Sequence, residues 1–113
     1  MDDSGRLWRL CEGDETVAEI EITEADFPWL HGRLRARPGL ERWRPVFAED
    51  LALSRHLEEH ADADRVARSD ELYERLNADL ALVAPDGAAV AEFLLHVDGD
   101  EAWFRWIDAG PDE

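Results

Sequence analysis

The sequence predicts an α+β fold, with an antiparallel sheet of about five strands in the chain order ββ-αα-βββ and two main helices packed on one face. Three observations lead to this prediction. Apolar and polar residues alternate near both ends of the chain, apolar residues recur at helical spacing in the middle, and Gly-containing turns separate the segments. The 113 residues have the size of one ordinary domain, and no linker-like stretch interrupts them. We therefore expect a single domain over residues 1–113.

The first two strands are expected at residues 6–12 and 16–23, on either side of a turn at 13–15. Alternate residues of the second segment are apolar and are expected to share one face: Ala18, Ile20 and Ile22. Residues 23–26 then match the spacing of a helix capping box. They predict a short helical turn, followed by a mostly irregular segment over 27–44.

Two helices are expected in the middle of the chain, over 45–60 and about 64–77. Pro45 suits the first turn of a helix, where its missing N–H has no partner to lose. The apolar residues of the first helix form a broad face: Val46, Phe47, Leu51, Leu53 and Leu57. The residues of the second helix that are expected to point inward are Val66, Leu72, Tyr73 and Leu76.

The C-terminal third predicts a meander of three strands, over 80–84, 90–97 and 102–107. Asp98-Gly99 between the last two strands is among the stronger short-range signals for a hairpin. The last strand has large side chains on both faces: Trp103, Arg105 and Ile107 on one, Phe104 and Trp106 on the other. Both faces are therefore expected to be covered, unless one of them is a contact surface.

Charge is the strongest global feature of the chain. It has 28 acidic and 12 basic residues, a formal net charge of −16, and its basic residues are all arginine. A field of this sign repels phosphate backbones and anionic lipid, which disfavours nucleic acid as a partner and argues against a membrane. Cys11 is the only cysteine and the first residues lack the pattern of a signal peptide, so the expected location is cytoplasmic.

Residues 27–46 are the exception to this acidity, because five arginines and one acid give them a local charge of +4, against −20 for the remainder. These arginines either pair with the domain's own carboxylates, or contact an acidic partner or a second copy, or form a nucleotide or RNA site. The last strand adds further aromatic residues that are typical of interfaces. The candidate interaction residues are Trp29, Arg33, Arg35, Arg37, Trp43, Arg44, Trp103, Arg105 and Trp106.

Residues 56–60 fit the pattern H-x-x-E-H, in which two histidines four residues apart on a helix hold zinc. A helical wheel places His56 and His60 beside Glu49, so the three side chains are a candidate metal site. The alternative is that these groups only solvate the edge of the helix.

Catalytic and cofactor motifs are not recognisable elsewhere, so no cofactor and no catalytic residue are predicted. His96 lies on the same strand face as Glu92, and this pair is expected to form a cross-strand hydrogen bond rather than a catalytic dyad. Three acids cluster at Asp98, Asp100 and Glu101, where a tight hairpin turn accounts for the Asp-Gly pair without calcium.

Two segments, EIEITEADFPWLHGRL at 19–34 and EFLLHVDGDEAWFRW at 92–106, resemble those of an uncharacterised family of small acidic actinobacterial proteins of unknown function. The resemblance covers most of the chain. It implies a bacterial cytoplasmic domain, and it transfers no activity and no site residue.

These observations favour a non-enzymatic protein-interaction domain, of regulatory or immunity type, whose acidic surface attracts a basic protein partner. One alternative is a metal- or small-ligand-dependent enzyme that uses the helix edge at His56 and His60. The other is a structural homodimer, joined through an edge strand or through the aromatic last strand.

Overall fold

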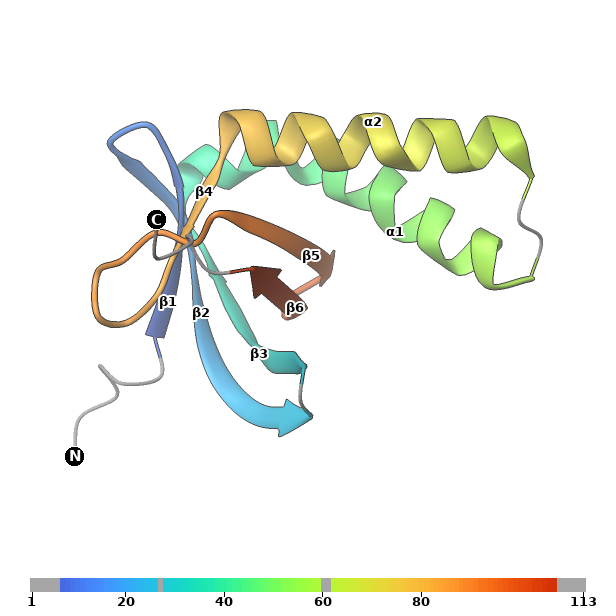
Figure 1. Ribbon diagram of the computed structural model, residues 1–113. Helices are drawn as coiled ribbons and strands as arrows, with labels where there is room; N and C mark the ends of the chain where they lie inside the picture. Colours follow the sequence, from blue (N-terminus) through green and yellow to red (C-terminus); the bar gives the residue numbers. More distant parts are fainter. Residues whose placement is uncertain (1–6, 27, 60–61, 108–113) are drawn as a thin grey trace, which may run out of the picture.

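Six antiparallel strands form one curled sheet in the spatial order β4-β1-β2-β3-β6-β5, and a pair of helices packs against it (Figure 1). The computed structural model describes residues 7–26, 28–59 and 62–107. The strands are β1 (Leu7–Glu12), β2 (Glu15–Asp26), β3 (Trp29–Ala36), β4 (Ala81–Val83), β5 (Glu92–Asp98) and β6 (Glu101–Ile107). The helical elements are the 3-10 turn η2 (Pro38–Arg42) and the helices α1 (Arg44–Glu59) and α2 (Ala63–Asp79). The predicted α+β class is confirmed, with six strands instead of about five.

The sixth strand is β3, which lies where the sequence predicted a mostly irregular segment. The capping-box prediction at 23–26 was also wrong, because β2 continues through these residues to Asp26. Strand pairing is favoured here because the side chains of β3 alternate, with Leu34 buried and Arg33 and Arg35 exposed. Gly32 allows close approach to β2, since a Cβ atom at this position would lie 2.5 Å from the carbonyl oxygen of Glu21.

The hydrophobic core lies between one face of the sheet, the beginning of α1 and the end of α2. Trp8 of β1 packs edge-to-face on Phe104 of β6, with 5.0 Å between the ring centroids. The fully buried side chains from the sheet include Leu10, Ile20, Leu82 and Leu95, and those from the helices include Phe47 and Leu72. Burial of these side chains is the main stabilising term of the fold.

The helix pair extends well beyond the sheet (Figure 1). We call residues 44–51 of α1 and 72–79 of α2 the near half, because they contribute the buried residues Phe47 and Leu76. Residues 52–59 and 63–71 are the far half. The predicted helices at 45–60 and 64–77 are confirmed within one or two residues at the ends that the structure describes. The inward direction predicted for Val66 was wrong: this side chain is 41% exposed, because it lies in the far half.

Asn77 of α2 connects the helix pair to the edge of the sheet at β5. Its amide oxygen accepts a hydrogen bond from the backbone N–H of Phe93 (2.9 Å), and its amide nitrogen donates to the carbonyl oxygen of Phe93 (3.0 Å). The side chain therefore replaces the backbone of a neighbouring strand at this position. Such pairing protects an edge strand against pairing with other chains.

Two predicted hairpin turns are confirmed by glycines with positive φ, at Gly13 (60°) and Gly99 (65°). Neither described helix is long and apolar enough to cross a membrane.

Candidate functional site: a cleft between the helix pair and the last two strands

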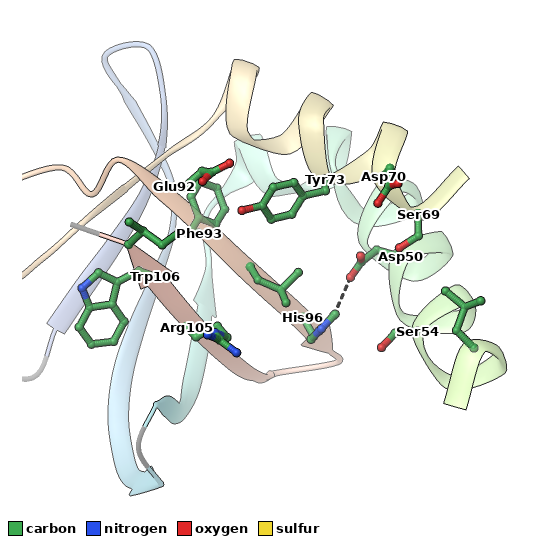
Figure 2. Close-up of a pocket in the computed structure, with 13 residues that line it drawn as sticks. Asp50, Ser54, Ser69, Asp70, Tyr73, Glu92, Phe93, His96, Arg105 and Trp106 are labelled. Carbon is green, nitrogen blue, oxygen red and sulfur yellow. Dashed lines mark hydrogen bonds and ion pairs between the residues drawn. The ribbon is translucent and has the colours of Figure 1, made fainter. Parts of the chain in front are cut away.

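A cavity of about 610 Å³ lies between the helix pair and strands β5 and β6 (Figure 2). We call it the cleft. Its helix wall consists of Asp50, Ser54 and Leu57 from α1 and Ser69, Asp70 and Tyr73 from α2. Its sheet wall includes Glu92, Leu94, His96, Arg105, Trp106 and Ile107. A cavity of this size, lined by apolar groups and a few polar ones, is typical of a binding site.

Regular secondary structure directs these side chains into the cleft. On α2, Ser69 and Asp70 lie four and three residues before Tyr73, so the three side chains share one helical face. On β5, Glu92, Leu94 and His96 are alternate residues and share the face of the sheet opposite the core. Most of the sheet wall is therefore the outer face of strands whose inner face builds the core, and Trp106 reaches the cleft from the inner face.

A buried pair of Asp50 and His96 joins α1 to the outer face of β5. The distance between His96 Nδ1 and Asp50 Oδ2 is 2.8 Å, and both side chains are less than 10% exposed. The imidazole stacks on the indole of Trp29, with 5.9 Å between centroids, and contacts that of Trp103 at 5.8 Å. The cross-strand bond predicted between His96 and Glu92 was wrong, because α1 supplies the carboxylate instead.

A carboxylate on Nδ1 is also how a general-base histidine is oriented. Ser54 and Ser69 both line the cleft, but within the described part of the chain no hydrogen bond joins either hydroxyl to His96. Two indoles and the carboxylate of Asp50 enclose the ring. This arrangement holds the helix pair on the sheet and sets the width of the cleft.

The charges in the cleft are unequally paired. Asp70 and Glu92 lie on opposite walls, and neither forms an ion pair with a described residue. The guanidinium of Arg105 lies 6.0 Å from the ring centroid of Trp29. Burial, and then the charge and hydrogen bonding of Glu92, raise the pKa of Tyr73, so its hydroxyl remains a neutral donor at physiological pH.

The arginines of residues 27–46 mostly pair with carboxylates of the same chain. Arg35 binds Glu21 (2.7 Å) and Arg37 binds Glu19 (3.0 Å), and both pairs lie on the outer face of the sheet. Two further arginine pairs are Arg42 with Glu12 and Glu15, and Arg44 with Glu41. Arg33 has no ion pair with the residues that the structure describes.

Hydrogen bonds from Arg42 and Trp43 lower the pKa of Glu12. The indole nitrogen of Trp43 donates to Glu12 Oε1 at 3.0 Å, and the ring is only 4% exposed. Trp43 is thus part of the core.

The other candidate tryptophans lie on β3 and β6. Trp29 and Trp103 are half-buried beside His96 on the outer face. Trp106 is half-buried, contacts the core ring of Trp8 at 4.9 Å and also lines the cleft. Of the aromatic candidates, Trp106 is therefore the one that contributes to this cavity.

The candidate metal residues are only partly described. Glu49 binds Arg68 through both carboxylate oxygens (2.6 and 2.9 Å), and these hydrogen bonds lower the pKa of Glu49. His56 Nε2 lies 3.9 Å from a carboxylate oxygen of Asp62, and His60 lies outside the described residues. Over 7–26, 28–59 and 62–107, no three His, Cys, Asp or Glu residues are grouped so that they could hold a metal ion.

The chain has no match among models of protein families, curated proteins or solved structures. The function is therefore inferred from the cleft and from the charges around it.

The sequence alone did not predict the cleft. One signal for it was available, since Asp50 lies between Phe47 and Leu51 on the apolar face of α1 and is 5% exposed. An acid in such a position requires a buried partner. No comparable signal was available for Asp70 or Leu94, because their role depends on where the helix pair lies over the sheet.

Proposed function

We propose that the chain is a non-enzymatic interaction domain, of regulatory or immunity type, that binds a basic protein partner. A bacterial cytoplasmic setting and membership of the small acidic actinobacterial family belong to the same proposal. The observation that carries it is the unequal pairing of charge. Internal ion pairs engage the arginines Arg35, Arg37, Arg42, Arg44, Arg55, Arg65 and Arg68.

These pairs leave many carboxylates without a cation of their own. On α2, Asp70, Glu74 and Asp79 are exposed and form no ion pair with a described residue, and Glu92 of β5 lies across the cleft from Asp70. The long-range field of a chain with net charge −16 accelerates encounter with a positively charged protein. A basic partner is therefore the class that this surface favours.

Affinity capture tests this proposal. The purified protein is immobilised and exposed at low salt to a native lysate of the cells that produce it. We expect one basic protein to be retained and to elute as the salt concentration rises, because screening weakens charge-driven association. Recovery of nothing above the background of an equally acidic control protein would contradict the proposal.

A further inference from the structure

We propose that the cleft is the docking site of that partner, and that it receives a short segment that carries an arginine or lysine beside apolar side chains. The apolar side chains pack on Leu57, Leu94 and Ile107, and the cation lies between Asp70 and Glu92. This inference rests on the proposed function and adds to it a location and a chemistry.

One exposed apolar side chain lines the cleft, and a second lies beside it on α2. Among the described residues, the exposed large hydrophobic side chains are Val66 (41%) and Ile107 (59%). Ile107 lines the cleft, and Val66 lies one helical turn before Asp70 on the same face of α2. Apolar groups left in water in and beside one groove indicate an interaction site.

The charges in the cleft select the occupant. Asp70 from α2 and Glu92 from β5 approach it from opposite walls, and in Figure 2 Tyr73 lies between them. A cation placed there meets two carboxylates, and the hydroxyl of Tyr73 already forms a hydrogen bond with Glu92. A second copy of this chain would bring a net charge of −16 to the same place, so its approach is opposed by repulsion.

The length of the groove limits the occupant to a short segment. Asp50 and Leu57, which both line the cleft, are two helical turns apart, which corresponds to about 10 Å along α1. This distance accommodates about two turns of a bound helix, or three residues of an extended strand. A volume of about 610 Å³ suits a few inserted side chains rather than a whole domain face.

Two peptides of about 12 residues provide the probe. In the basic peptide, leucine and arginine recur at helical spacing, and in the acidic peptide glutamate replaces each arginine. Fluorescence anisotropy of the labelled peptides gives the dissociation constants at about 150 mM salt, where exposed long-range charges are screened. We expect the basic peptide to bind and the acidic peptide to show no binding.

Two double variants with the same change in charge locate the site. Asp70→Asn with Glu92→Gln removes the two cleft carboxylates that form no ion pair with a described residue, and should raise the dissociation constant of the basic peptide on the order of tenfold. Glu74→Gln with Asp79→Asn removes exposed carboxylates of α2 that do not line the cleft, and should change the affinity by less than about twofold. Unchanged melting temperatures verify that both variants are folded.

Three results would overturn the inference: equal weakening by both double variants, equal binding of the acidic peptide, or a concentration-dependent dimer that Ile107→Ser dissociates. The first assigns binding to diffuse surface charge, the second to apolar contact alone, and the third to a second copy of the chain.

Binding of the captured partner to the cleft variant distinguishes this inference from the proposed function. If the partner binds the cleft variant as tightly as the wild type, the inference fails while the proposed function stands. If nothing is captured, but the basic peptide still needs Asp70 and Glu92 for binding, the proposed function fails while the cleft remains a site for basic segments.

Discussion

The near and far halves of the helix pair belong to the same two helices, yet they have different surroundings. In the near half, Phe47 and Leu72 are fully buried against the sheet. In the far half, Leu57 and Ser69 are only half-buried and line the cleft, and Val66 is exposed. One element can thus stabilise the fold with one end and leave partly exposed apolar surface at the other, a feature that is typical of interaction sites.

The largest expected effect comes from removing a near-half core side chain. Phe47→Ala leaves a cavity in the core and should lower the free energy of unfolding by about 4 kcal/mol. Leu57→Ala, in the far half, should lower it by less than about 1 kcal/mol, because its side chain is already partly in water. Urea denaturation measures both values. Equal losses would show that the two halves do not differ in their contribution to stability.

A second large effect is expected at the contact between the helix pair and the sheet edge. Asn77→Ala leaves the backbone N–H and carbonyl of Phe93 without their present partners and should cost about 3 kcal/mol. Hydrogen exchange should also accelerate at the amide of Phe93. Asn77→Asp is the matched control, because it keeps the acceptor for the N–H and removes only the donor.

The bond between Asp50 and His96 should contribute less. Asp50→Ala should lower the free energy of unfolding by about 2 kcal/mol, because it leaves the buried imidazole without its partner. A double-mutant cycle with His96→Phe isolates the contribution of the pair. Additive losses in the two single variants would contradict a direct coupling between α1 and β5.

The smallest effect is the dependence of stability on alkaline pH. The pKa of Tyr73 is raised above its usual value of 10.0, so the folded protein retains this proton longer than the unfolded chain does. The associated stability is present below pH 10 and is lost as the pH rises through the raised pKa. Tyr73 is the only tyrosine, so ultraviolet absorbance follows its ionisation directly. Melting temperatures between pH 9 and 11 should fall less steeply in Tyr73→Phe; identical slopes would contradict the assignment.

Local patterns predicted most of the elements but not their relative placement. The alternation of Leu34 with Arg33 and Arg35 was visible in the sequence, but neighbouring Gly and Pro residues suggested turns and concealed β3. The pair of Asp50 and His96 joins residues 46 positions apart, which no local pattern specifies. The exposure of Val66 could not be predicted for the same reason. Its spacing is that of the apolar face of α2, but the helix extends past the sheet at this residue.

In our proposal, the two walls of the cleft, one from the helix pair and one from β5 and β6, together bind a basic segment. Titration of the ¹⁵N-labelled protein with the basic peptide tests it most directly. We predict saturable shifts of the backbone amides of Tyr73, Leu94 and Ile107 and of the indole N–H of Trp106, with little change at the β1–β2 hairpin. Shifts confined to β1 and β2, or spread evenly over every acidic surface, would contradict the claim.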